Sequence, residues 1–222
     1  MKKVKLMEAE KKALKLFEEI EKREILRPGK SENEINKEIF DLALELYGIE
    51  KYWHKRIIRS GKNTLLPYNE TPPDLIIQEE DILFIDFGPV FEEWEADFGR
   101  TFVIGNDPYK IKLKNDIELA WHEAKQYFEK QKKITGAELF HYAVELAKKY
   151  GWTFGGKMAG HIIGQFPHEK LDPDNWGLYI HPQNHNDLLL PDKDGNRREW
   201  ILEMHFVDTE KQIGGFFEQL MT

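Results

Sequence analysis

The sequence predicts a mixed fold in which pairs of helices alternate with groups of antiparallel strands. Two observations indicate this architecture. Apolar residues recur at helical spacing in four segments, and two other segments carry the apolar runs that are typical of β-hairpins. The elements follow the order helix, helix, strands, and then helix, helix, strands again. This order would suit a divergent internal duplication, although no repeat is visible residue by residue.

The elements outside the hairpins follow from periodicity and turn signals. Arg27-Pro28-Gly29-Lys30 breaks the first helix, Ser31-Glu32-Asn33-Glu34 has the form of a capping box that opens the second, and Gly48 suits its C-cap. Gly, Asn and Pro mark the loops. The predicted elements are helices over residues 8–23, 31–48, 114–130 and 136–150, a strand over 55–60, and loops over 61–75 and 165–198.

The first hairpin candidate runs from Asp81 to Ile104. If the chain turns near Phe91-Glu92, Asp86 lies directly opposite Asp97. Directly opposed residues share one face of a sheet, with Cβ atoms roughly 4.5–5.5 Å apart. Both acids stand among apolar neighbours, so the sequence predicts a carboxylate pair in apolar surroundings.

The second hairpin candidate runs from Ile201 to Leu220. A turn near Glu210-Lys211 places Glu203 opposite Glu218, again between apolar arms. Like charges that face each other in a strand pair are destabilising, and buried carboxylates either protonate or recruit cations. Arginine or lysine could compensate such pairs, and solvent-facing pairs would need no compensation. Divalent metals suit buried pairs better, because one carboxylate can bridge two ions.

A histidine segment supplies a candidate nitrogen ligand. His161 is flanked by Gly160 and by two β-branched residues, so it can project from a strand or from the end of one, and His168 follows seven residues later. The HExxH pattern is absent, which excludes a zincin site. One histidine with four carboxylates favours Mn²⁺, Fe²⁺ or Co²⁺, with Zn²⁺ as an alternative.

Composition excludes several classes of function. The net charge of −8 and the pI of about 5.6 argue against nucleic-acid or anionic-membrane partners. The absence of cysteine excludes disulfides, thiolate zinc sites and cysteine nucleophiles. No apolar run has the form of a signal peptide or a membrane span. We therefore expect a soluble, cytoplasmic protein with one domain over residues 1–222.

Taken together, these residues give the sequence a resemblance to the pita-bread metallopeptidases, the family of methionine aminopeptidase, aminopeptidase P, prolidase and creatinase. In that family the ligands run Asp, Asp, His, Glu, Glu along the chain. The resemblance extends from about residue 8 to residue 222 and is strongest to the Xaa-Pro peptidases, although we expect no counterpart of their N-terminal domain. The matching residues are Asp86-Phe87-Gly88, Asp97-Phe98-Gly99-Arg100-Thr101-Phe102, Gly160-His161-Ile162-Ile163-Gly164, His168-Glu169, Glu203 and Glu218.

The resemblance implies an α+β fold of two pseudo-symmetric halves around a curved, mostly antiparallel sheet. It also implies two divalent metal ions. Asp97 and Glu218 would bridge the ions, Asp86 would complete one, and His161 with Glu203 would complete the other.

The resemblance further implies catalytic roles. A water between the metals would be the nucleophile. Glu203 would shuttle its proton, and His168 would hydrogen-bond the substrate carbonyl or the developing oxyanion.

Several departures from the family pattern concern the substrate. The family usually has a histidine in the loop that Pro67-Tyr68-Asn69 fills here, and no histidine lies between His54 and His122. That substrate-binding role is therefore either unfilled or passed to Tyr68 or Asn69. Three further positions differ: Phe216 replaces the arginine of aminopeptidase P and prolidase, Met204 replaces the proline of methionine aminopeptidases, and Lys170-Leu171 replaces a proline after Glu169.

Several functions remain open at this point. An Xaa-Pro-type peptidase leads, because Ile162 stands where methionine aminopeptidases have glycine. The loop from Leu171 to Arg198, in which His181 or His185 could contact substrate, favours a family member that acts on a small non-peptide metabolite as a C–N hydrolase or lyase. A methionine aminopeptidase and a non-catalytic binding protein are further alternatives. The expected partner is a small peptide or amide substrate, with a homodimer as one arrangement.

Overall fold

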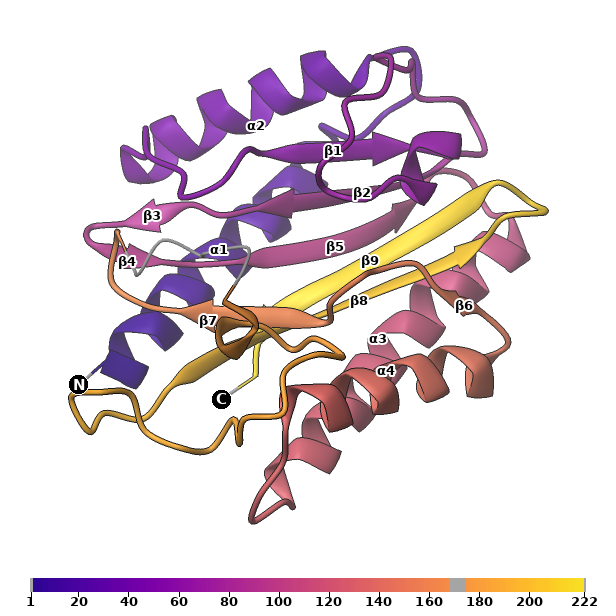
Figure 1. Ribbon diagram of the computed structural model, residues 1–222. Coiled ribbons are helices and arrows are strands. Elements are labelled where there is room, and N and C mark those ends of the chain that lie inside the picture. The colour runs from indigo at the N-terminus through magenta and orange to yellow at the C-terminus, as the bar shows by residue number, and fades with distance from the viewer. Residues whose placement is uncertain (1, 168–174, 222) are drawn as a thin grey trace.

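The computed structural model describes residues 2–167 and 175–221 (Figure 1). Its elements in chain order are α1 (Lys2–Lys22), α2 (Glu32–Tyr47), β1 (Ile57–Ser60), the 3₁₀ turn η1 (Gly61–Leu65), β2 (Ile82–Phe87), β3 (Val90–Phe91), β4 (Trp94–Glu95), β5 (Phe98–Val103), α3 (Pro108–Glu129), α4 (Gly136–Tyr150), β6 (Thr153–Phe154), β7 (Gly160–Ile163), the 3₁₀ turn η2 (Trp176–Leu178), β8 (Glu199–Asp208) and β9 (Ile213–Leu220).

One antiparallel sheet organises the molecule. Its strands follow the order β1-β2-β5-β9-β8-β6, and β7 also pairs with β8. The two predicted hairpins, β2 with β5 and β8 with β9, stand side by side at the centre, where β5 meets β9. Helices combined with antiparallel strands confirm the predicted α+β class.

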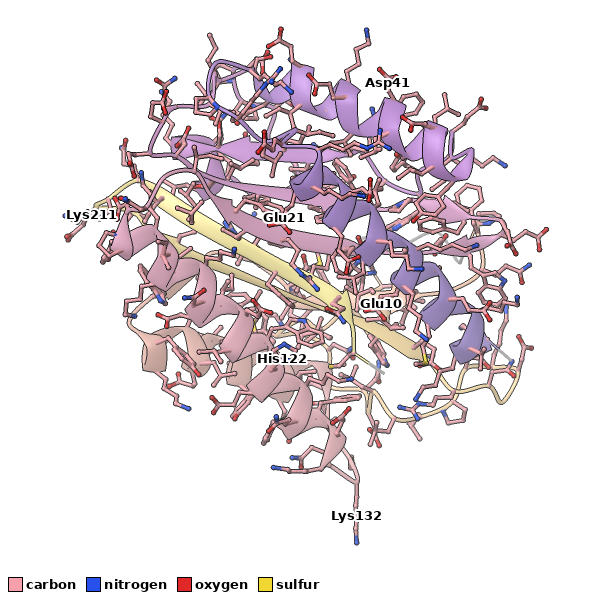
Figure 2. All side chains as sticks on the ribbon, turned by 180° about the vertical axis from the view of Figure 1, so that it is seen from behind. Glu10, Glu21, Asp41, His122, Lys132 and Lys211 are labelled. Atoms are coloured by element: carbon pink, nitrogen blue, oxygen red, sulfur yellow. The ribbon has the colours of Figure 1, made fainter. Side chains whose placement is uncertain are left out.

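The helices cover one face of this sheet in two groups. The core beneath α1 and α2 contains Leu83, Ile85 and Phe87 of β2, whereas the core beneath α3 and α4 contains Leu202 and Met204 of β8. Figure 2 shows this face from behind, with α1, which carries Glu10 and Glu21, and α3, which carries His122, lying across the sheet. Each half of the chain therefore places two helices over its own hairpin.

Local signals explain most helix boundaries. Both α2 and α4 begin with a capping box, formed by Ser31 with Glu34 and by Thr135 with Glu138. The start of α3 lies six residues before the predicted Lys114, because the Asp107 side chain accepts hydrogen bonds from two backbone N–H groups and proline suits the first helical turn. Within the two described ranges, no helix is both long and apolar enough to span a bilayer.

The first hairpin differs from the prediction in its register. Phe91 pairs with Trp94, so the chain turns at Glu92-Glu93, one residue later than predicted. Asp86 therefore lies opposite Gly99 and not opposite Asp97. Because side chains alternate with a period of two, this two-residue shift keeps both acids on the same face.

The second hairpin has the predicted register. Glu203 pairs with Glu218, and the strands are joined through residues 209–212. The Asp208 side chain accepts hydrogen bonds from the N–H groups of Glu210 and Lys211, which fixes the turn where the sequence places it.

Candidate metal centre

Strand alternation separates the acidic residues from the core. In β8, Leu202 and Met204 pack beneath α3 and α4, so Glu203 points to the opposite face of the sheet. In β2, Ile85 and Phe87 pack beneath α1 and α2, which turns Asp86 to that same opposite face. The candidate site therefore lies on the face that the helices leave uncovered.

Four neighbouring strands align the acids in one row. Asp86 pairs with Gly99, Gly99 pairs with Glu218, and Glu218 pairs with Glu203. A Cβ atom on Gly99 would lie 2.6 Å from ring carbons of Phe216 and 3.0 Å from Glu218 Cβ. Glycine at this position therefore allows the two hairpins to approach closely, with an acid on each side.

Two residues of β5 join the hairpins beside this row. The Thr101 hydroxyl donates to the Phe216 carbonyl at 2.8 Å and accepts from the Phe216 N–H at 2.7 Å. Arg100 stacks between Phe98 and Phe217 and donates to the Glu218 carbonyl at 2.8 Å. These contacts fix β9, and with it Glu218, against β5.

Asp97 and His161 complete the predicted ligand set. Asp97 immediately precedes β5, and His161 lies in β7, where it pairs with Ile201 of β8. His161 Nε2 lies 3.0 Å from Asp97 Oδ2. Its Nδ1 donates to the Ile162 carbonyl at 2.8 Å, which leaves Nε2 to face the acids.

Burial and the neighbouring charges shift the pKa values of these acids in opposite directions. Burial raises the pKa of Asp86 to about 6 and that of Glu203 to about 7, and burial together with the other acids raises the pKa of Glu218 well above its ordinary value. Burial also acts to raise the pKa of Asp97, but His54 and His161 outweigh it and lower the pKa to about 2. Without cations, the raised pKa values of Asp86, Glu203 and Glu218 favour proton uptake by the cluster.

The donor set suits divalent metal ions. Asp86 Oδ1 and Glu218 Oε2 are buried and have no hydrogen-bond partner among the residues that the structure describes. Two groups of three side chains bring their ligand atoms within 4.8 Å of one another, Asp97 with His161 and Glu218, and Asp97 with His54 and Asp86. Carboxylate oxygens with one or two imidazole nitrogens are ligands that first-row divalent ions accept.

His54 is a site residue that the sequence did not reveal. It lies between α2 and β1, and its Nε2 is 3.1 Å from Asp97 Oδ1 and 3.6 Å from Asp86 Oδ1. Burial lowers its pKa, but Asp86 and Asp97 raise it more, to about 9. Its position 32 residues before Asp86 belongs to no periodic pattern, so only the fold brings it to the acids.

The predicted substrate-binding residues lie in different environments. The Tyr68 ring lies 5.9 Å from that of His54, at the edge of the acid cluster. Asn69 and His185 are exposed, and His181 stacks on Trp176 with a ring distance of 4.0 Å. Within the described parts of the chain, no contact joins His181 to the acids. His168 lies outside the described residues.

Comparison with known proteins identifies the family. The sequence profile of metallopeptidase family M24 matches residues 4–193. An Xaa-Pro dipeptidase from Pyrococcus horikoshii is 29% identical over 148 residues, which are 66% of this chain and 41% of that protein. The chain thus spans less than half the length of this curated relative.

Solved structures show the same fold. A dipeptidase structure from Pyrococcus horikoshii OT3 has a TM-score of 0.75 and 25% identity, and the match covers 99% of this chain and 59% of that one. A methionine aminopeptidase from Rickettsia prowazekii has a TM-score of 0.72 and 16% identity, covering 98% and 91%. With its family profile, its relatives and its pita-bread fold in agreement, the chain belongs to metallopeptidase family M24.

Proposed function

We propose that this member of the family is a dinuclear metal-dependent hydrolase that cleaves the amide bond of an Xaa-Pro peptide. One observation carries the proposal. Asp86, Asp97, His161 and Glu218 belong to two close groups of candidate ligand atoms, Glu203 pairs with Glu218 on the neighbouring strand, and among the described residues no hydrogen-bond partner faces buried oxygens of Asp86 and Glu218. Such a cluster needs cations, and hydrolysis is the chemistry of this family.

The placement of Asp97 and Glu218 supports a bridging role for both. The two oxygens of Asp97 face different histidines, Oδ1 toward His54 and Oδ2 toward His161. Glu218 stands between the Asp86 side and the Glu203 side of the row. Asp86 would then help to hold one ion, and His161 with Glu203 would help to hold the other. Mn²⁺, Co²⁺ and Fe²⁺ suit this set, with Zn²⁺ as an alternative.

The proposed mechanism assigns proton transfer to Glu203. Two divalent ions, when bound, lower the pKa of a water molecule and polarise the scissile carbonyl. Glu203 is partly exposed and pairs with Glu218 beside the cluster, so its carboxylate could take a proton from water and return it to the leaving amine. His168 would donate a hydrogen bond to the substrate carbonyl oxygen, a role that rests on the family resemblance alone.

The substrate class follows from the relatives and from the motif around the ligands. The Pyrococcus horikoshii relative is an Xaa-Pro dipeptidase, and both Asp97-Phe98-Gly99-Arg100-Thr101-Phe102 and Ile162 are typical of Xaa-Pro peptidases. Phe216 favours a second candidate, a small non-peptide amide. Where an arginine would offer charge, Phe216 packs at 5.3 Å on Phe84 in an apolar cluster with Ile57.

The test measures cleavage after controlled loading with metal. The protein is stripped with a chelator, loaded with Mn²⁺, Co²⁺, Fe²⁺ or Zn²⁺, and assayed on Xaa-Pro dipeptides and on matched Xaa-Ala dipeptides. The proposal predicts metal-dependent cleavage that requires proline. Bound metal without cleavage of any peptide would contradict the peptidase assignment and direct the search to small amides.

Glu203→Gln tests the proton-transfer role. We expect kcat to fall roughly 10²–10⁴-fold, the usual contribution of a general acid–base group. Glu199→Gln is the matched control, because Glu199 is a buried acid on the same strand, outside the acid row. Equal losses in both variants would show that the effect is structural.

His168→Ala should retain metal and slow catalysis, and loss of metal would contradict its substrate-binding role.

A further inference from the structure

We infer that His54 is a sixth protein ligand of the metal centre, placed on the ion that Asp86 and Asp97 hold. This inference rests on the proposed dinuclear site and extends it beyond the five predicted ligands. It concerns a residue that lies far from the ligand motifs in the sequence and reaches the acids through the segment between α2 and β1.

The position of the imidazole suits coordination. His54 Nε2 lies 3.1 Å from Asp97 Oδ1 and 3.6 Å from Asp86 Oδ1, and only 7% of the side chain is exposed. Neighbouring ligands of an ion with metal–ligand distances of about 2.1 Å lie about 3.0 Å apart. The corresponding distance from His161 Nε2 to Asp97 Oδ2 is 3.0 Å, so the two histidines approach opposite oxygens of one carboxylate in the same way.

The second nitrogen of each ring is held in the same manner. His54 Nδ1 lies 2.8 Å from the carbonyl of Lys55, and His161 Nδ1 lies 2.8 Å from the carbonyl of Ile162. In both cases the carbonyl belongs to the next residue and fixes a proton on Nδ1, so Nε2 is the nitrogen whose lone pair a metal would take when it displaces the second proton. Ligand histidines almost always have such an outer partner. His54 therefore has the same arrangement as the predicted ligand His161.

The surrounding chain holds His54 in this place. The Trp53 N–H donates to the Gly88 carbonyl at 2.9 Å, and the Trp53 indole donates to the Ala96 carbonyl at 3.1 Å. A Cβ atom on Gly88 would lie 2.1 Å from His54 Cδ2 and 2.4 Å from its Nε2. The glycine two residues after Asp86 thus makes room for the ring, and both anchors lie next to the acids that would share the ion.

A role as a substrate contact fits this geometry less well. A histidine that binds substrate needs a nitrogen directed away from the ligands, but Nδ1 of His54 is engaged by Lys55 and Nε2 points between Asp86 and Asp97. Tyr68, whose ring lies beside His54 and is partly exposed, is better placed to meet a substrate.

Ligation by His54 would change the character of the centre. Without it, the ion at Asp86 has only carboxylate ligands from the protein, which favour Mn²⁺. With it, each ion receives one imidazole nitrogen. Imidazole suits iron, copper, nickel and zinc, so we expect the Asp86 site to bind Zn²⁺ or Co²⁺ more tightly relative to Mn²⁺ than a carboxylate-only site would.

Proton NMR of the Co²⁺-loaded protein tests the assignment. A histidine bound to Co²⁺ through Nε2 keeps its proton on Nδ1, and the paramagnetic ion shifts that exchangeable signal far from the rest of the spectrum. With two equivalents of Co²⁺ we expect two such signals, one each from His54 and His161. This readout needs no substrate and no variant.

Variants assign the two signals. His54→Ala should remove one signal and weaken binding of one ion by at least the ~10–100-fold that loss of an outer-sphere partner costs. His161→Ala should remove the other, and His122→Ala, which removes an exposed histidine from α3, should retain both. Gly88→Ala changes no ligand residue, but its added methyl group displaces the His54 ring. This variant should therefore also remove the His54 signal.

The outcomes separate this inference from the proposed function. Two bound ions with a single signal that disappears in His161→Ala would overturn the role of His54 and leave the five-ligand site intact. Failure to bind Co²⁺ at all would overturn the proposed function itself.

Discussion

At the scale of single residues, the site depends on glycine, because the absence of a side chain allows acidic side chains on neighbouring strands to approach one another. Gly99 is the clearest case, because it pairs with Asp86 on one side and with Glu218 on the other. Its lack of a side chain lets Phe216 and Glu218 approach β5. The row of acids on β2, β9 and β8 therefore requires a glycine at the position of β5 that lies within the row.

Gly99→Ala tests this dependence. The added methyl group would meet the Phe216 ring at 2.6 Å, so we expect a loss of about 1–3 kcal/mol in unfolding free energy together with weaker metal retention. Gly177→Ala is the control, since among the described residues its added methyl group would meet only the side-chain ends of Asn175 and Asn186, at 3.1 Å or more. Denaturant unfolding and elemental analysis measure both effects. Unchanged metal content in Gly99→Ala would contradict the importance of this close approach.

Residues also mark the limit of prediction from the sequence. The five predicted ligands follow from the family resemblance, supported by the apolar hairpin arms around the acids and by the position of His161 between glycine and β-branched residues. His54 was not recognisable, since it follows Trp53 in a segment without periodicity and meets Asp97 only through the fold. Gly88 was part of a recognised motif, but its role in making room for His54 is visible only in three dimensions.

At the scale of elements, the two hairpins show why one register was predictable. The β8–β9 turn is fixed locally by the Asp208 side chain, so Glu203 lies opposite Glu218 as predicted. The β2–β5 arm contains the additional short strands β3 and β4, which move the turn to Glu92-Glu93. Apolar alternation survives a two-residue shift, which is why the predicted face was right although the predicted partner was wrong.

Helix caps give a prediction at this scale. Thr135→Ala removes the side-chain oxygen that accepts from the Glu138 N–H and should lower unfolding free energy by about 0.5–2 kcal/mol. Because α4 packs against α3 and β6, away from the acids, metal content should not change. Thr209→Ala, in the exposed turn between β8 and β9, serves as the control. A loss of metal in Thr135→Ala would show that α4 supports the site.

At the scale of the whole molecule, the two halves meet at a cluster of like charges. Each half is stabilised by its own helices and core, and the acids face one another where β5 joins β9. Packing of the two cores stabilises a fold in which the acids would otherwise repel one another. Metal ions would remove this opposition, so stability and metal binding should be linked.

This linkage predicts a pH dependence for the metal-free protein. Asp86, Glu203 and His54 have pKa values of about 6, 7 and 9, all raised above those of an unfolded chain. The folded state therefore binds more protons at Asp86 up to about pH 6, at Glu203 up to about pH 7 and at His54 up to about pH 9, so its stability falls as pH rises, between pH 6 and 8 mainly through Glu203 and His54. The pKa of Asp97, about 2, affects stability only in stronger acid.

Thermal unfolding in the presence of a chelator measures this effect. A loss of only 1 kcal/mol would lower Tm by roughly 2–4 °C in a domain of this size, and we expect at least that between pH 6 and 8. Protein saturated with metal should show a smaller decline, because ions then replace protons among the carboxylates. Identical pH profiles with and without metal would contradict the linkage.

The most direct test of the central claim is the metal stoichiometry of the wild-type protein beside that of Glu218→Ala. A centre with two ions that share Asp97 and Glu218 predicts about two equivalents of Mn²⁺ or Co²⁺ per wild-type chain. It also predicts the loss of both ions in the variant, since each would lose a ligand. A wild-type chain that binds no more than one equivalent, or a Glu218→Ala chain that still binds two, would contradict it.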